Sequence, residues 1–275
     1  MKTFGFFPIN VNSKAMSTAQ HRQKAIVELL SREGGRLSVN SLSERLGVSS
    51  VTIRQDLRVL AGDRVVDRVY GGAVLRAGGA PLSELSFEAR AREATRQKDA
   101  IGRHAAALVK PGYGIALDGS TTACALVPYL KQIANLTIVT NSLIVAQQLR
   151  DAESHTVLMT SGRLRRESAT IVGTLNGLPP INLNLGFFGA WGVSLIAGIT
   201  DVNPEEVRMR QVMIEHCLET IIVVDGRKMG EVAPYTYATL DRISRIITDD
   251  SAPPHVVSDL CSQWVTVDVV PVSRS

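Results

Sequence analysis

From Gly102 onward, short apolar runs alternate with helical stretches, and a polar loop follows almost every run. Apolar runs separated in this way are typical of strands that are buried on both faces of a parallel sheet. The runs occupy residues 115–117, 136–139, 156–159, 185–188, 220–224 and 244–247. We therefore expect an α/β layer fold with a parallel sheet over about residues 96–260.

The loops after these runs carry glycine, hydroxyl, amide and lysine groups. Ligands bind at the carboxyl ends of strands in such sheets. Gly119 to Thr122 has the parts of an anion cradle, because glycine lets the backbone approach closely and a helix N-terminus donates N–H groups. Each loop alone is more often a turn and a helix cap, but together they favour a phosphorylated small molecule. The candidate effector-binding residues are Asp118, Gly119, Ser120, Thr121, Thr122, Thr140, Asn141, Ser142, Gly162 and Lys228.

A basic module precedes this body. Residues 1–77 hold 12 lysines and arginines against 6 acidic residues, whereas residues 78–275 hold 18 against 20, so the net charge of +4 comes from the N-terminal part. Three helical segments between Thr18 and Ala61 are followed by two apolar stretches around Gly71-Gly72, which predict a closing hairpin. We expect residues 1–17 to be a disordered tail and residues 18–75 to be a winged helix-turn-helix.

The third helical segment has the two faces that a recognition helix needs. Ile53, Leu57 and Leu60 share one face, and donors and a small apolar group lie opposite, where base edges would be read. A solvated amphipathic helix is the alternative, and the basic outer face and the trailing hairpin favour DNA over it. The helix-turn-helix covers about residues 37–56. The candidate DNA-binding residues are Ser38, Ser49, Ser50, Val51, Thr52, Arg54, Gln55, Arg58 and Arg68.

Residues 76–95 are expected to link the two domains. Ala77 to Pro81 is rich in glycine and ends in proline, which is a linker signal. The charged run from Glu88 to Lys98 predicts a solvated helix that leads into the second domain.

Residues 37–57 and the segment Arg68 to Ala73 resemble the DNA-binding domain of the DeoR-type family, bacterial regulators of sugar operons. The resemblance continues through the C-terminal domain, at the segments 118–122, 139–143, 162–164, 192–206 and 225–230. It implies a cytoplasmic repressor that is released from double-stranded operator DNA by a phosphorylated sugar or a related metabolite. It also implies a homo-oligomer, a dimer or tetramer, and a sensor domain similar in fold to ribose-5-phosphate isomerase and glucosamine-6-phosphate deaminase.

Four positions depart from the family pattern. The family usually has a second arginine where this chain has Gln55, and a histidine where it has Tyr70. It often has Gly-Gly where this chain has Gly162-Arg163, and a small residue in place of Arg227. These changes bear on the preferred operator, on the shape of one loop and on the positive charge of the effector pocket.

Two other classes of function compete with this interpretation. A sugar-phosphate isomerase or deaminase with an accessory DNA-binding module needs a general base, typically a carboxylate. Where the related isomerases carry an acidic loop, this chain reads Phe188 to Gly192 without a carboxylate, and Asp118 alone is more often structural. An RNA-binding or scaffolding protein is the third class, and the low aromatic content of 5% argues against stacking on single strands. We therefore expect no enzyme activity.

Several classes of protein are excluded by what the sequence lacks. It has no run of 18 apolar residues, which predicts no membrane span, and its first ten residues lack the apolar run of a signal peptide. Its three cysteines are scattered and suit a reducing cytoplasm, and its five histidines show no metal-binding spacing. We expect no metal and no cofactor.

Overall fold

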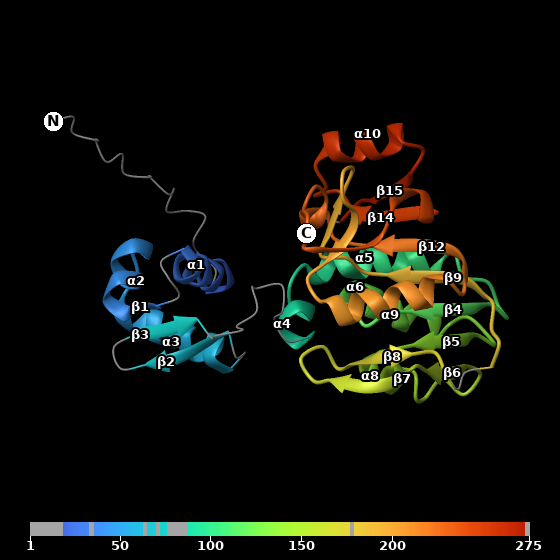
Figure 1. Ribbon diagram of the computed structural model, residues 1–275, viewed down its shortest axis with the longest axis horizontal. Coiled ribbons are helices and arrows are strands. Elements are labelled where there is room, and N and C mark those ends of the chain that lie inside the picture. The colour runs from blue at the N-terminus through green and yellow to red at the C-terminus, as the bar shows by residue number, and fades with distance from the viewer. Residues whose placement is uncertain are drawn as a thin grey trace. The chain divides into compact units, whose positions relative to one another are not determined.

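The computed structural model of the chain describes residues 19–32, 36–62, 65–69, 72–75, 87–176 and 179–272. The chain divides into two units, Met1–Leu85 and Ser86–Ser275, which are described separately (Figure 1). The tail expected over residues 1–17 lies outside the described residues, as do residues 76–86 of the expected linker.

The first unit contains three helices, α1 (Ala19–Arg32), α2 (Val39–Leu46) and α3 (Ser50–Gly62). The Ser38 side chain caps α2 by accepting a hydrogen bond from the N–H of Ser41 at 3.1 Å, and Gly47 ends the helix in the left-handed region with φ 63°. The apolar side chains of the three helices form one core that includes Ile26, Leu30, Leu42, Ile53, Leu57 and Leu60. The helix boundaries follow these caps and this periodicity, as the sequence predicts.

A three-stranded antiparallel sheet completes this unit. The predicted hairpin is present as β2 (Val66–Val69) and β3 (Gly72–Leu75). A further strand, β1 (Arg36–Ser38), pairs with β3 on the other side. The sequence analysis missed β1 because three residues are too few to show an alternation. The unit is a winged helix-turn-helix.

The second unit is built on a seven-stranded parallel sheet with the order β15-β14-β12-β9-β4-β5-β6 (Figure 1). All six apolar runs of the sequence lie in it, so the predicted parallel sheet is confirmed. Its strands are β4 (Gly114–Leu117), β5 (Thr137–Thr140), β6 (Thr156–Met159), β9 (Leu183–Phe188), β12 (Cys217–Val223), β14 (Arg245–Asp249) and β15 (Thr266–Val270). The sheet extends past residue 260, where we placed the end of the domain, because β15 forms one edge.

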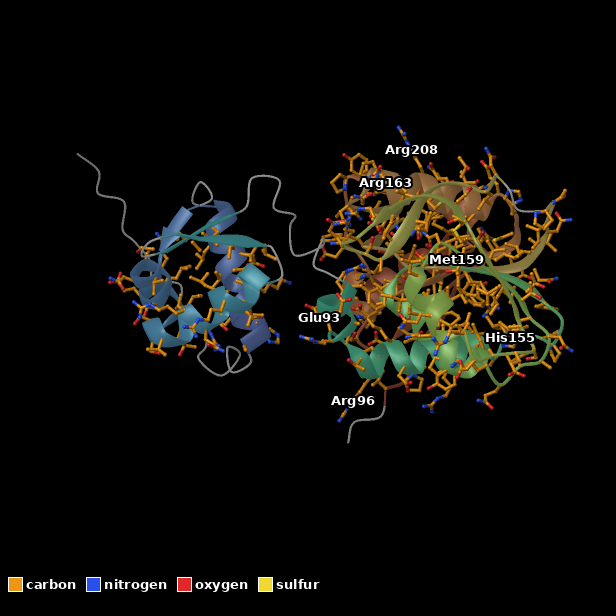
Figure 2. All side chains as sticks on the ribbon, turned by 90° about the horizontal axis from the view of Figure 1, so that it is seen from below. Glu93, Arg96, His155, Met159, Arg163 and Arg208 are labelled. Carbon is orange, nitrogen blue, oxygen red and sulfur yellow. The ribbon has the colours of Figure 1, made fainter. Side chains whose placement is uncertain are left out.

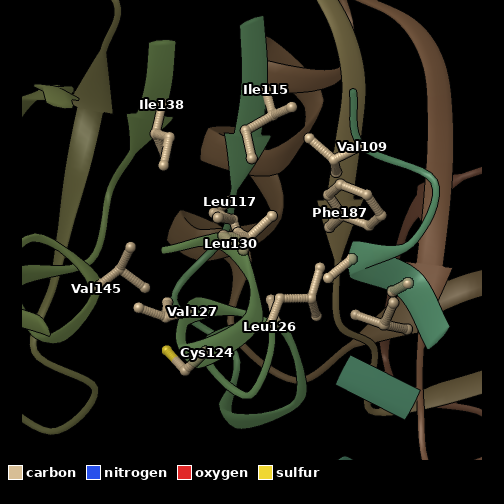
Figure 3. Packing of buried hydrophobic residues seen from close by; sticks show 14 of the residues in the cluster. Val109, Ile115, Leu117, Cys124, Leu126, Val127, Leu130, Ile138, Val145 and Phe187 are labelled. Atoms are coloured by element: carbon tan, nitrogen blue, oxygen red, sulfur yellow. The ribbon is translucent and has the colours of Figure 1, made fainter. Parts of the chain in front are cut away.

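Helices cover both faces of this sheet. Ile115 and Leu117 of β4 face one core, shown in Figure 3 with Phe187, whereas Ala116 between them faces the other. The first core is closed by α5 (Thr95–Ala106), α6 (Thr121–Cys124), α7 (Val127–Leu130) and α8 (Leu143–Gln148). The second core is closed by α9 (Pro204–Ile214) and α10 (Pro254–Ser262). Burial on both faces explains why the strands read as unbroken apolar runs.

The helical part of the expected linker belongs to the second unit. Residues 87–91 form α4 (Phe87–Ala91), and Phe87 packs into the first core. The expectation that the run ending at Lys98 is solvated is wrong at its end, because Lys98 is only 5% exposed. Lys98 lies in the first turn of α5, and its ammonium donates a hydrogen bond to the Arg90 carbonyl of α4.

Two antiparallel additions extend the second unit. A hairpin of β7 (Ser161–Arg165) and β8 (Thr170–Thr174) follows β6. A small sheet joins β10 (Gly192–Ser194), β11 (Gly198–Asp201) and β13 (Tyr235–Ala238), and the short helices η2 (Gly226–Lys228) and η3 (Leu240–Arg242) lie in loops. Where the sequence analysis expected a loop after β6, Gly162 lies in β7 opposite Gly173. None of the helices among the described residues is long and apolar enough to cross a membrane.

Candidate DNA-binding surface and effector site

The outer face of α3 exposes the side chains that the sequence analysis singled out. Arg54, Gln55 and Arg58 are exposed, and the Val51 side chain is 71% exposed although it is apolar. The guanidinium of Arg58 lies 3.4 Å from the Gln55 side-chain oxygen, so the two form one polar surface. Guanidinium and amide groups pair with base edges, and a valine methyl suits a thymine methyl.

The remaining candidates for DNA binding lie at helix ends and in the hairpin. Ser38 and Ser49 occupy the N-termini of α2 and α3, and the Ser49 hydroxyl accepts a hydrogen bond from the Thr52 N–H at 3.2 Å. Ser50 is the first residue of α3. Arg68 lies in β2 opposite Ala73. Helix N-termini of this kind offer free N–H groups to phosphate.

A buried carboxylate holds α3 against α1. Asp56 is 2% exposed, and its oxygens accept hydrogen bonds from Arg22 at 2.5 and 3.1 Å and from Gln23 at 3.2 Å. Asp56 therefore fixes α3 against α1 and does not belong to the exposed face of α3. The sequence analysis did not assign it a role, although a carboxylate beside Ile53 and Leu57 on the apolar face was the available signal.

In the second unit, the loops after β4 and β5 lie side by side because their strands are neighbours. Ser120 and Ser142 have the same role in the two loops, since each caps the helix that follows, α6 and α8. The Thr140 hydroxyl crosses between the strands and donates to the Leu117 carbonyl at 2.7 Å. Thr121, Thr122 and Asn141 are buried as well. The structure thus brings together two polar loops that the sequence analysis grouped as candidates for effector binding.

The Asp118 carboxylate holds the first loop in place. It is fully buried, and its Oδ1 accepts from the Ser120 N–H at 3.0 Å while its Oδ2 accepts from the Gly189 N–H at 3.2 Å. The Arg210 guanidinium donates to the same Oδ2 at 2.7 Å. Both oxygens are therefore occupied by groups of the chain, and Asp118 positions the loop that follows it.

Arg210, on α9, is the central residue that the sequence analysis missed. Besides Asp118, it contacts the carboxylates of Asp201 at 2.7 Å and Glu206 at 3.6 Å, and it lies 5.4 Å above the Tyr237 ring. Burial lowers the pKa of a guanidinium, but these carboxylates raise the pKa of Arg210 well above its usual value. Its signal in the sequence was an arginine at helical spacing among the apolar Val207, Met213 and Ile214 of the same element.

The β7–β8 hairpin packs against both polar loops. Ser142 pairs with Thr170 of β8, and a Cβ on Gly119 would lie 2.1 Å from the Thr170 methyl carbon. Thr170 also donates to Glu206 at 3.2 Å. Arg165 of the same hairpin pairs with Glu206 at 2.9 Å, and its side chain is mostly buried. Arg163 pairs with Glu205 on the surface of the second unit, at the edge where Figure 2 labels both Arg163 and Arg208.

Lys228 approaches the loops from the strand beyond β9. Its ammonium donates a hydrogen bond to the Ala190 carbonyl at 2.7 Å. The preceding residue, Gly189, lies so close to Ser120 that a Cβ on this glycine would come within 2.3 Å of the Ser120 side chain. Burial lowers the pKa of Lys228, and Asp225 acts in the opposite direction. The loops after β4, β5, β9 and β12 therefore converge at one end of the sheet.

The chain matches two family models. The family model "DeoR-like helix-turn-helix domain" matches residues 22–77, and "DeoR C terminal sensor domain" matches residues 93–250. The transcriptional regulator GolR of Listeria innocua is 33% identical over 231 residues, which are 83% of this chain and 90% of that protein. The glycerol-3-phosphate regulon repressor of Escherichia coli K12 is 30% identical over 252 residues, 90% of this chain and 98% of that protein.

Among solved structures, ribose 5-phosphate isomerase A from Methanocaldococcus jannaschii is similar at 16% identity over 48% of this chain and 52% of that protein, with a TM-score of 0.36. This likeness carries no inference about function. The matched families and the relatives are regulators of transcription, so the enzyme considered in the sequence analysis is set aside. The chain belongs to the DeoR family of DNA-binding transcriptional regulators.

Proposed function

We propose that the protein represses a carbohydrate-metabolism operon and leaves its operator when the second unit binds a phosphorylated sugar or a related metabolite. One relative is the repressor of a glycerol-3-phosphate regulon, which supports both the sign of regulation and the class of effector. We propose a cytoplasmic location as well, because its DNA partner is there and its three cysteines are free.

The observation that carries this proposal is the convergence of polar loops at the carboxyl ends of β4, β5, β9 and β12. The hydroxyls of Thr121 and Thr122, the N-terminus of α6 and the Lys228 ammonium are groups that hold a phosphate. Asn141 is 3% exposed, and its side-chain oxygen has no hydrogen-bond partner in the described part of the chain. A sugar hydroxyl would satisfy this acceptor.

The effector site comprises Gly119, Ser120, Thr121, Thr122, Thr140, Asn141, Ser142, Gly162 and Lys228, with Asp118 as the residue that positions the first loop. The DNA-binding surface comprises Ser38, Ser49, Ser50, Val51, Thr52, Arg54, Gln55, Arg58 and Arg68. Two such surfaces in a homo-oligomer would read paired half-sites, as helix-turn-helix proteins commonly do. An effector can release the operator only if its affinity differs between the two states of the protein.

The test measures operator binding by fluorescence anisotropy, on promoter fragments from the genomic neighbourhood of the gene. Binding should weaken steeply with salt, by ~10³–10⁵ between about 50 and 200 mM if roughly six to ten phosphates are contacted. A panel of sugar phosphates is then screened for release. Lys228→Ala should bind the operator normally and resist release, and Lys110→Ala, which removes an exposed lysine, should respond like the parent protein.

The proposal fails if no promoter fragment binds, or if the chain converts a pentose or hexose phosphate. Loss of both operator binding and release in Lys228→Ala, or of neither, contradicts the assignment of Lys228.

A further inference from the structure

An exposed apolar turn lies on the small sheet of β10, β11 and β13. The turn between β10 and β11 carries Leu195 and Ile196, which are both exposed, Ile196 at 99%. Tight turns usually carry glycine, proline or short polar residues at such positions. Tyr235 and Thr236 of β13 are exposed as well. These four residues are called the tip-and-edge surface below.

The outer edge of β13 has no neighbouring strand. β13 pairs with β11 on one side, and no strand pairs with its other side among the residues that the structure describes. The opposite edge of the small sheet is covered, because Val193 of β10 bridges Met229 and accepts a hydrogen bond from the Gly230 N–H at 2.7 Å. A free edge offers backbone donors and acceptors to another strand. Pro234 has no N–H to offer, so the free edge begins at Tyr235.

The turn and the edge form one continuous surface. The Thr236 hydroxyl donates to the Ala197 carbonyl of the turn at 3.0 Å, and a Cβ on Gly198 would lie 2.5 Å from the Ala238 carbonyl oxygen. The turn therefore lies at the Ala238 end of the edge, and Tyr235 is at the other end. If two such edges pair antiparallel, the turn of each lies next to the Tyr235 end of the other.

The charge distribution favours a second copy of this chain as the occupant. At an interface with two-fold symmetry, a charged group near the axis meets its own kind, and like charges opposite each other on paired strands are destabilising. Residues 189–200 and 232–240 hold β10, β13 and all of β11 except Asp201. They contain no Asp, Glu, Lys, Arg or His, although 20% of the chain is charged. Self-pairing therefore meets no repulsion, and an acidic or basic partner would find no opposite charge here.

We propose that the tip-and-edge surface joins two copies of the chain. Their β13 strands pair antiparallel across a two-fold axis, and Leu195 and Ile196 of each copy pack against Tyr235 of the other. The inference rests on the proposed function, which includes a homo-oligomer, and it names the surface that forms that oligomer. Backbone hydrogen bonds hold such an added strand, and the apolar side chains determine which strand is accepted.

Sedimentation velocity of the full chain over a range of concentrations tests this interface. The parent should sediment as a dimer or as an assembly of dimers. Ile196→Lys and Tyr235→Lys should each raise the dissociation constant of the dimer about tenfold or more, because each places an ammonium in the apolar contact. Leu218→Lys is the matched control. It replaces an exposed apolar residue at the amino end of β12, whereas the small sheet follows the carboxyl end of β9, and it should assemble like the parent.

Hydrogen exchange identifies what covers the edge of β13. In the parent, the amide protection of residues 235–238 should increase with protein concentration, and Ile196→Lys should lose this increase. Protection that does not depend on concentration would mean that another segment of the same chain covers the edge. An unprotected edge in a monomeric parent is the result expected if the surface serves a different protein. Either result contradicts the proposal.

The proposal is also overturned if both lysine variants assemble like the parent, or if Leu218→Lys dissociates as they do. The two variants lie at different ends of the surface, so the second keeps the test decisive if the first does not fold. Lysine variants that assemble like the parent and still release the operator with effector would contradict this inference alone. A parent that is monomeric at every concentration would contradict the inference and the homo-oligomer of the proposed function together.

Discussion

Gly119 gives the sharpest test of how the loop after β4, the first loop of the proposed effector site, is held. A Cβ at this position would lie 2.1 Å from the Thr170 Cγ2 methyl carbon of β8, whereas the next atoms, Thr170 Cβ and Ser142 Cβ, are at the ordinary distances of 3.5 and 3.6 Å. One methyl group therefore accounts for the clash. Because β8 is held by its pairing with β7, we expect Gly119→Ala to destabilise the second unit by about 1–3 kcal/mol, the usual cost of overpacking.

Thr170→Ser removes that methyl group and keeps the hydroxyl that donates to Glu206. In the double variant, the new Cβ meets ordinary contacts alone, so the double variant should be more stable than the sum of the two single changes predicts. The coupling free energy should be about 0.5–3 kcal/mol. Both tryptophans, Trp191 and Trp264, lie in the second unit, so intrinsic fluorescence during urea unfolding reports on this unit.

Two outcomes would refute this reasoning: a Gly119→Ala variant as stable as the parent, or single-variant effects that simply add in the double variant. Additivity would mean that the loop shifts to make room, and that the hairpin does not fix it.

Three further predictions concern both units. Asp56→Ala leaves Arg22 and Gln23 without their buried partner and should destabilise the first unit by ~3 kcal/mol. The unfolding transition followed by circular dichroism should then begin earlier, while the transition followed by tryptophan fluorescence should not change. Glu44→Ala, which removes an exposed carboxylate, should have little effect on either transition. Burial raises the pKa of Glu206, but Arg210, Ser168 and Arg165 together lower it from 4.5 to about 2, so its stabilising contribution is complete above pH 4.5 and is lost as the pH falls toward 2. Urea unfolding should therefore show a loss of about 2 kcal/mol between about pH 6 and pH 3 that Glu206→Gln lacks, and equal pH dependence in both proteins would contradict it. Arg54→Ala should weaken operator binding by ~1–3 kcal/mol and relax the preference at one base pair, while the exposed Arg208→Ala of the second unit should not; unchanged affinity and specificity would reject base reading by Arg54.

The strands of the second unit were predictable because burial on both faces leaves an apolar run, as at Ile115 to Leu117. The helices of the first unit were predictable because Ser38, Gly47 and Ser49 cap them locally. Short or edge elements were not. β1 has three residues, and β15 is an edge strand whose apolar residues alternate with Thr266 and Asp268.

The polar loops of the proposed effector site were predictable as a group because neighbouring parallel strands end at the same edge of the sheet. The hydrogen bonds within these loops were not predictable. Arg210 and Glu206 lie about ninety residues from Asp118 along the chain, and only the folded sheet brings them together. Lys98 looks solvated in a charged run, since a sequence does not show which face of a helix its neighbours will cover. Contacts between distant segments are decided by tertiary packing, which local patterns do not encode.

Both oxygens of the Asp118 carboxylate accept hydrogen bonds from groups of the chain, and this bears on which side chains near the loop can be substituted. Because the backbone course of the first loop is set by Asp118 with Ser120, Gly189 and Arg210, the neighbouring Thr121 and Thr122 are left out of that task. Side chains beside the cradle can then be exchanged to suit a different metabolite while the cradle keeps its shape. In the proposed effector site, holding the loop and choosing the metabolite would thereby fall to adjacent positions.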